Sequence, residues 1–129
     1  MGARAVIGLA FLLAMAAPAL AQVAQGSTVK FAGISRATPQ LKGDVMVAIS
    51  AYTKARHSCG SIATVETAPM AKDFEPKTPM YRVSESGRIY ERWVADVCGA
   101  KRAFLVALWP SPKGGADYKV VEVPPGTDP

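Results

Sequence analysis

The groups best suited to chemistry in this 129-residue chain are its single histidine, His57, and its two cysteines, Cys59 and Cys98. A cysteine nucleophile needs an imidazole close enough to take the thiol proton. His57 lies two residues before Cys59, a spacing that seldom allows this contact. The three residues would also supply three of the four ligands of a zinc site, but no paired CxxC or HxxxH spacing accompanies them. We therefore expect neither a Cys–His enzyme nor a bound metal.

The acidic residues do not form a catalytic pair. Glu91 and Asp96 belong to one expected strand but face opposite sides of it, so they cannot flank one bond of a substrate as the two carboxylates of a glycosidase do. The "SPKGG" segment lacks the strand and helix that surround a phosphate-binding loop and is better explained as a turn. The sequence thus predicts no catalytic residue and no cofactor.

The N-terminal residues predict export. A single charged residue precedes an apolar stretch, Ala5–Ala17, which Pro18 ends, and the "ALA" at 19–21 has the small residues of a signal-peptide cleavage site. The stretch is shorter than the roughly 20 apolar residues that cross a bilayer, so no transmembrane anchor is expected. We expect a signal peptide over residues 1–21, a single domain over residues 22–129, and a periplasmic or secreted protein.

Export gives the two cysteines a structural role. Small exported proteins meet oxidising conditions and are often stabilised by disulfides. A bond between Cys59 and Cys98 would close a loop of about 40 residues, for which the chain-entropy estimate is about 4 kcal/mol, and measured values are often lower. We expect this disulfide.

The positive charge is concentrated near the start of the domain. Between Gln22 and Ser61 five basic residues face Asp44 alone, whereas the remaining chain is balanced. The partner of such a protein would be an envelope protein, an anionic polymer or a small apolar ligand, although an ordinary solvated surface also accounts for the charge. Nucleic acid is not an expected partner of an exported protein.

The candidate groups are positioned by one helix and several strands. Thr38 followed by Pro39 is a typical helix start, with Thr as the cap and Pro in the first turn. From there the apolar residues fall on one arc, and polar residues, including Thr53, fall on the other side; the apolar arc consists of Leu41, Val45, Ala48, Ile49, Tyr52 and Ala55. Met46 and Val47 lie off this arc, and Val45–Val47 would alternatively form a strand.

The rest of the domain is rich in strand-forming residues. We expect strands at Thr28–Ala32, Ile62–Thr67, Arg88–Cys98, Arg102–Trp109 and Asp117–Val123, with a proline-rich connection over 68–86. A two-residue turn at Gly99-Ala100, of the type with glycine first, would join the third and fourth of these strands. The sequence predicts an α+β fold with two layers: one amphipathic helix on an antiparallel meander of three to five strands.

Alternation along the strands then separates two faces. One is almost entirely apolar and is expected under the helix: Ile89, Trp93, Ala95, Val97, Phe104, Val106 and Leu108. On the other face, Tyr90 and Trp109 would be directly opposed with Arg92 beside them. These are the residue types enriched in binding hot spots, so we expect a binding site there. Alternatively the connection at 68–86 covers this face and Trp109 belongs to a second small core; a register slip of one residue would exchange the faces.

The segment "WVADVCGAKRAFLVALW", Trp93 to Trp109, resembles a pattern of small uncharacterised bacterial envelope proteins. An aromatic residue leads a strand, Cys-Gly ends it, and a second strand follows. The resemblance implies an exported module with a cysteine at a hairpin corner, and it implies no activity.

The sequence as a whole favours an exported, non-enzymatic binding or interaction module of the bacterial cell envelope. The alternatives are an accessory subunit that uses Met46 and Val47 as contacts in a larger assembly, and a hydrolase. The few groups available for acid–base work argue against the hydrolase.

Overall fold

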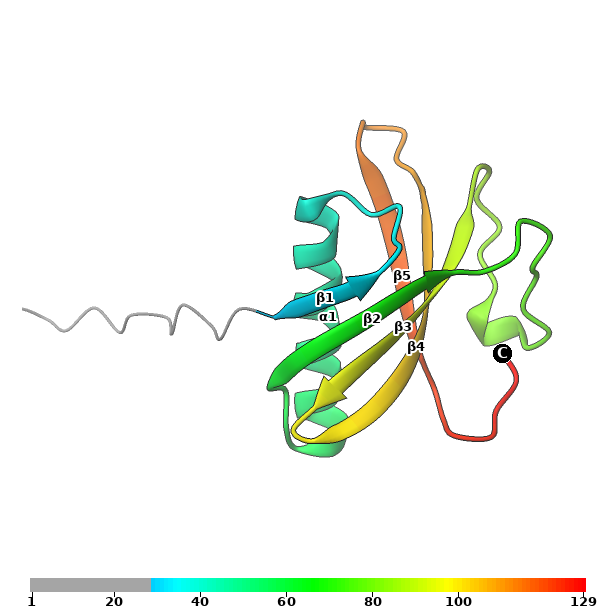
Figure 1. Ribbon diagram of the computed structural model, residues 1–129. Helices are drawn as coiled ribbons and strands as arrows, with labels where there is room; N and C mark the ends of the chain where they lie inside the picture. The colour runs from blue at the N-terminus through cyan, green and yellow to red at the C-terminus, as the bar shows by residue number, and fades with distance from the viewer. Residues whose placement is uncertain (1–28) are drawn as a thin grey trace, which may run out of the picture.

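The computed structural model describes residues 29–129, in which one helix lies against a five-stranded sheet (Figure 1). The elements are β1 (Lys30–Gly33), α1 (Pro39–His57), β2 (Ile62–Pro69), a short 3₁₀ turn η1 (Pro79–Tyr81), β3 (Ile89–Val97), β4 (Ala100–Pro110) and β5 (Ala116–Val123). The predicted α+β fold with two layers is confirmed. The predicted signal peptide lies outside the described residues. Within them, no helix is both long and apolar enough to cross a membrane.

Helix α1 begins as the sequence predicts. The Thr38 hydroxyl accepts a hydrogen bond from the Leu41 amide at 3.2 Å, and Pro39 occupies the first turn. The buried face is rotated from the expected arc, because Met46 and Thr53 are buried while Tyr52 is 40% exposed. Thr53 tolerates burial because its hydroxyl donates to the Ile49 carbonyl one turn earlier, at 2.9 Å.

The strands lie side by side in chain order, β1-β2-β3-β4-β5. Three of the four pairings are antiparallel, as in the expected meander, but β1 pairs parallel to β2. Helix α1 lies between β1 and β2 in the chain and explains this difference. It returns the chain to the end of the sheet at which β1 begins, so β2 runs in the same direction as β1. Gly33 ends β1 at a φ of 85°, and a Cβ atom there would lie 2.0 Å from the Thr67 carbonyl oxygen. Only glycine fits this position.

The turn between β3 and β4 is Cys98-Gly99 rather than Gly99-Ala100. Val97 pairs with Ala100, and both turn residues have positive φ, 52° for Cys98 and 83° for Gly99. Positive φ at both central positions defines a type I′ turn, not the expected type with glycine first. The Asp96 carboxylate supports the turn by accepting from the Gly99 amide at 3.0 Å.

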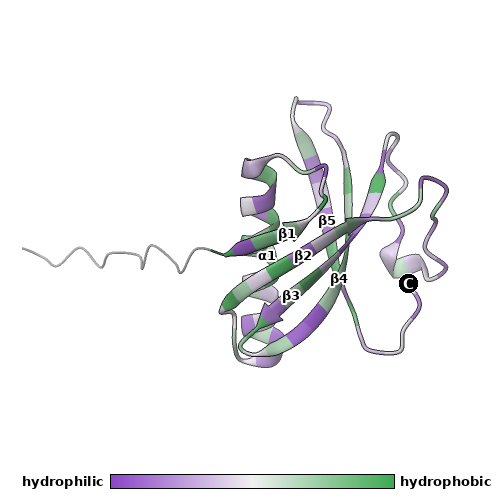
Figure 2. Ribbon diagram, viewed as in Figure 1, coloured by the Kyte–Doolittle hydropathy of each residue, from purple (hydrophilic) through white to green (hydrophobic). Residues whose placement is uncertain are grey.

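This change moves the predicted register by two residues, so the faces of the strands stay as predicted. Trp93 pairs with Phe104 instead of Val106, and the apolar face packs under α1 as expected. The buried core on this side consists of Ala37, Leu41, Val45, Met46, Ile49, Ile62, Val65, Trp93, Ala95, Val97, Phe104, Val106 and Leu108. Figure 2 shows hydrophobic and hydrophilic residues alternating along the strands, as a sheet with two different faces requires.

The predicted disulfide between Cys59 and Cys98 is present, with the two Cα atoms 6.4 Å apart. Cys59 lies just after α1, and Cys98 lies in the β3–β4 turn. The strand alternation would have pointed Cys98 away from the helix layer. A turn residue with positive φ is free of that alternation, so its sulfur reaches the end of the helix.

The face opposite α1, called here the second face, carries its own small core. Its buried residues are Tyr81, Val83, Tyr90, Leu105 and Ala107, with Met70, Phe74, Trp109, Val121 and Val123 packed around them. The β2–β3 connection, residues 70–88, supplies four of these and therefore covers part of the second face.

Candidate binding site

The three residues predicted to bind a partner have different environments. Tyr90 is 5% exposed and belongs to the second small core, Trp109 is half-buried at its edge, and Arg92 is exposed. Tyr90 pairs with Ala107 and Trp109 with Asp117, so the predicted opposition of the two aromatic rings is wrong. The turn at Cys98-Gly99 is the reason, because it moved the partner of every β3 residue by two positions.

Tyr90 holds the connection in place. Its hydroxyl accepts from the Val83 amide at 3.0 Å, and its carbonyl accepts from the Met70 amide at 2.8 Å. The ring of Phe74 packs edge-on against it with centroids 5.6 Å apart. The connection therefore covers the second face around Tyr90 and Ala107, as the alternative interpretation of the sequence expected.

The other end of the second face is hollowed. A cavity of about 500 Å³, called here the second-face hollow, lies between the sheet and the C-terminal segment, residues 124–129. Its apolar lining comes from β3, β4, β5, the connection and the C-terminal prolines. The apolar residues include Met70, Phe74, Val94, Ala103, Leu105, Val123, Pro124, Pro125 and Pro129. Arg92 and Lys101 line the same hollow. Of the predicted binding residues, Arg92 alone borders this space.

The outer wall of the hollow is held to the connection. The Lys77 amide donates to the Pro129 oxygen at 3.2 Å, and the Lys77 ammonium pairs with Asp128. The Thr127 amide donates to the Pro124 carbonyl at 3.1 Å, which closes a turn within the C-terminal segment. These contacts bend the C-terminal segment back toward the connection, as its course in Figure 1 shows.

The charges around the hollow leave two cations free. In the described part of the chain, neither Arg92 nor Lys101 takes part in an ion pair, whereas Arg102 pairs with Glu122 at 3.3 Å. Asp96 is the register neighbour of Lys101, but the hydrogen bond that its carboxylate makes is with the turn amide of Gly99. Glu122 and Asp128 line the hollow as well, but both carboxylates are paired, with Arg102 and Lys77 respectively. The hollow is therefore an apolar space whose unpaired charges are those of Arg92 and Lys101.

Glu122, which also lines the hollow, is the centre of a polar cluster that reaches the helix side. His57 Nε2 lies 2.9 Å from one of its carboxylate oxygens, and Arg102 donates to the other. Burial raises the pKa of Glu122, but its interactions with His57, Tyr52 and Arg102 outweigh burial and lower the pKa below its ordinary value of 4.5. Burial, followed by the interaction with Glu122, raises the pKa of the Tyr52 phenol.

This cluster joins the end of α1 to β4 and β5. Tyr81 adds a link from the other side by donating its hydroxyl to the Glu122 carbonyl at 3.2 Å. An acid–histidine pair supports catalysis when the second ring nitrogen activates a nucleophile. In residues 29–129 the ring of His57 has hydrogen bonds with Glu122 only. The geometry is that of a structural tie between the layers.

Besides Glu122, the structure holds a second carboxylate in a structural role, that of Glu91, which was not predicted from the sequence. The Glu91 side chain is fully buried on the helix face and accepts from the Ser35 hydroxyl at 2.7 Å, the Arg36 amide at 2.6 Å and the Trp93 indole at 2.8 Å. A buried carboxylate is tolerated when several donors satisfy it. Its position among apolar residues in an alternating strand was the signal for this role.

The two helix residues expected to contact an assembly partner, Met46 and Val47, differ in their exposure to solvent. Met46 is 9% exposed and packs in the core, so its predicted contact role is wrong, whereas Val47 is 70% exposed. A single exposed apolar side chain needs no partner to explain it. In the described residues, no group of three or more His, Cys, Asp or Glu side chains is placed to hold a metal ion.

Comparison of the chain with protein-family models, with curated proteins and with solved structures finds no match. The resemblance of Trp93 to Trp109 to bacterial envelope proteins therefore stays a prediction.

Proposed function

We propose that this protein is an exported, non-enzymatic binding module of the bacterial cell envelope, and that its ligand occupies the second-face hollow. The ligand is a small molecule with an apolar body and an anionic group. The Cys59–Cys98 disulfide supports an oxidising compartment, periplasmic or extracellular. The observation that carries the proposal is the hollow itself, an apolar space with two unpaired cations at its rim.

The size of the hollow supports a small ligand. Sites for small molecules are concave, mostly apolar, and about 300–1,000 Å³ in volume. The second-face hollow, at about 500 Å³, falls inside this range. Its floor consists of residues of β3, β4 and β5 that are held by backbone pairing between these strands, so the site needs little reorganisation on binding.

The charge supports an acidic group on the ligand. Arg92 offers a planar fork of donors that pairs with a carboxylate or a phosphate by two parallel hydrogen bonds. Lys101 adds a second positive charge at the same rim. An apolar ligand without an acidic group would leave both cations unpaired and would bind more weakly.

An anilinonaphthalene sulfonate dye is a suitable probe, because it combines an apolar ring system with an anionic group and fluoresces when bound. We expect saturable binding that Arg92→Gln weakens about tenfold, the loss of one charge-assisted pair. Ala103→Phe should weaken it further by filling the floor of the hollow. Lys113→Gln removes the same charge from the exposed β4–β5 turn and should change nothing.

The melting temperature of each variant is measured alongside the affinity. Equal dye affinities for Arg92→Gln, Ala103→Phe and Lys113→Gln would contradict the proposal, since the dye would then bind elsewhere. The accessory-subunit alternative has less support, because Val47 stands alone among the two residues predicted for it.

A further inference from the structure

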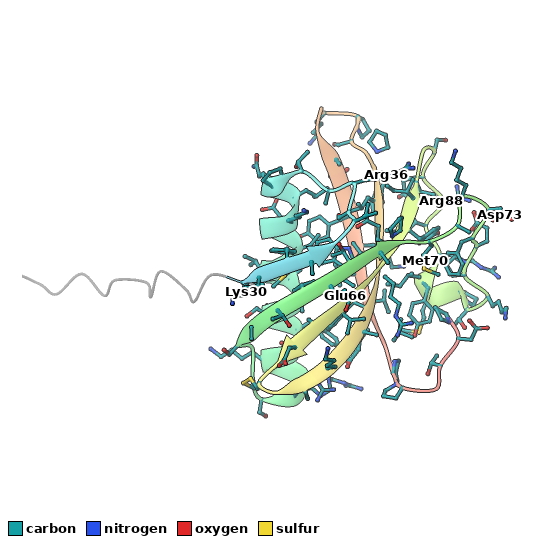
Figure 3. The ribbon with its side chains drawn as sticks, in the orientation of Figure 1. Lys30, Arg36, Glu66, Met70, Asp73 and Arg88 are labelled. Carbon is teal, nitrogen blue, oxygen red and sulfur yellow. A yellow bond between two sulfur atoms is a disulfide. The ribbon has the colours of Figure 1, made fainter. Side chains whose placement is uncertain are left out.

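A second, smaller pocket lies at the opposite end of the second face, and it is lined by three cations. It measures about 260 Å³ and lies between the start of the connection and the residues that lead into β3. Arg36, Lys72 and Arg88 line it together with one acidic residue, Glu75. Figure 3 labels Arg36 and Arg88, which come from segments 52 positions apart in the chain, and Met70 at the same pocket.

We propose that this pocket binds a compact phosphate group. Three positive charges against one negative charge leave an excess of two, which matches the charge of a phosphate monoester. The volume lies below the range of about 300–1,000 Å³ that is typical of sites for whole small molecules, so it suits a headgroup. The site is distinct from the second-face hollow, with which it shares Met70 and Phe74 as a wall.

Arg36 is held at the pocket by the buried carboxylate of Glu91. The Arg36 amide donates to Glu91 at 2.6 Å, and the Ser35 hydroxyl donates to the same group at 2.7 Å. The loop that Glu91 holds presents the exposed side chain of Arg36, which forms no ion pair within residues 29–129.

Arg88 is also held in place, and it keeps donors to spare. One terminal nitrogen donates to the Glu85 carbonyl and the other to the Glu75 carboxylate. Each terminal nitrogen of a guanidinium carries two N–H groups, so each retains one. The pairing with Glu75 raises the pKa of Arg88, which therefore keeps its charge.

Lys72 comes from a short turn that is anchored to β3 at its start and is closed by a hydrogen bond of its own. The Met70 amide donates to the Tyr90 carbonyl at 2.8 Å, and the Phe74 amide donates to the Ala71 carbonyl at 3.0 Å. The three cations thus reach the pocket from three anchored segments. Because these backbone positions are already held, binding a ligand has to order only the side chains.

The phosphate has two possible sources, a free ion or the headgroup of a lipid, and the experiment separates them. The protein is titrated with inorganic phosphate at low ionic strength, followed by ¹H–¹⁵N NMR, and is then sedimented with vesicles of phosphatidic acid, whose headgroup is a phosphate monoester, or with phosphatidylcholine vesicles. We expect saturable shifts at Arg36, Lys72 and Arg88. Sedimentation with the phosphatidic acid vesicles would assign the phosphate to a lipid, and its absence would assign it to a free ion.

Two variants with opposite signs make the test specific. Arg36→Gln should weaken phosphate binding about tenfold, because it removes a charge-assisted pair from a side chain that supports no other contact. Glu75→Gln should strengthen it several-fold, because Glu75 competes with the phosphate for Arg88. Lys54→Gln and Asp44→Asn change the net charge by the same amounts from exposed positions on α1 and should leave the affinity unchanged.

Shifts that do not saturate, or equal effects of Arg36→Gln and Lys54→Gln, would overturn the proposal, since phosphate would then be acting only as a general counterion. Arg92→Gln separates this site from the second-face hollow. It should leave phosphate binding intact while it weakens binding of the dye, so either site can fail without the other.

Discussion

On one face of the sheet, α1 covers Trp93, Phe104 and Val106, and none of the three is exposed to solvent. On the second face, the connection covers Tyr90 and Ala107 and stops before the end of the strands. A regular helix offers a continuous apolar stripe that matches the length of a sheet. An irregular connection covers only what its few apolar side chains reach, so the second face keeps a hollow.

Because of this difference, some residues of β4 are expected to matter mainly for stability and others mainly for binding. Successive residues of β4 point to opposite faces, so neighbours in the chain test different regions of the molecule. Phe104 lies in the helix-side core, Leu105 in the second small core, and Ala103 at the hollow. Changes at these three positions should therefore have very different effects.

The largest effect is expected at Phe104. Phe104→Ala should lower the free energy of unfolding by about 3–5 kcal/mol, because it leaves a closed cavity beneath α1. Leu105→Ala should cost about 2 kcal/mol, at the low end for a buried leucine, because its site opens onto the hollow and can relax. Urea denaturation of both variants measures the difference. Equal losses would show that the two faces are packed equally well.

Loss of the disulfide should come next. Replacing Cys59 and Cys98 with Ser should cost about 2–4 kcal/mol, since the bond closes a loop across 39 positions. Both ends of the bond lie away from the hollow lining. The melting temperature should fall while dye affinity below the melting transition stays unchanged. A parallel loss of affinity in the folded variant would mean that the disulfide shapes the hollow.

Trp109 lies at the edge of the second small core and tests whether this edge contributes to stability or to binding. Because it is half-buried, Trp109→Ala should cost about 1–2 kcal/mol, less than the roughly 3–5 kcal/mol of a fully buried aromatic residue. Since Trp109 does not line the hollow, dye affinity should be unaffected at temperatures where the variant is folded. If Trp109→Ala lowered the dye affinity without lowering the free energy of unfolding, Trp109 would belong to the binding site, as the sequence predicted.

The smallest effect concerns the tie between the layers. The folded-state pKa of Glu122 is lowered, so its contribution to stability is present above the ordinary pKa of 4.5 and is lost as the pH falls through the folded value. Glu122→Gln should cost about 1 kcal/mol at pH 7. The difference in melting temperature between the variant and the native protein should shrink below about pH 4.5. A constant difference from pH 7 to pH 3 would show that the charge of Glu122 contributes nothing.

Much of the fold was accessible from local sequence rules. The Thr38-Pro39 start of α1, the alternation along β3 and β4, and the pairing of two cysteines each depend on residues close in the chain or few in number. The turn type was missed because it required a non-glycine residue, Cys98, at positive φ, which propensity does not favour. The parallel pairing of β1 depends on how α1 packs, which no local pattern records.

The candidate site was predictable only in part. Alternation placed Arg92 on the second face, and it lines the hollow. The same rule could not foresee that Val83 and Phe74 would bury Tyr90, because contacts between a long irregular connection and a sheet have no periodicity. The contact of the C-terminal segment with Lys77, which forms the outer wall, has the same origin.

The most direct test of the central claim is an NMR titration of the protein with decanoate, which has an apolar chain and a carboxylate. We predict saturable amide shifts at the hollow end of the second face, including Arg92, Val94, Ala103 and Val123, with none along α1. The Arg92→Gln variant should require about tenfold more ligand for the same shifts. Shifts centred on the exposed side of α1, or the absence of saturation, would contradict the account that the second face binds and the helix face only stabilises.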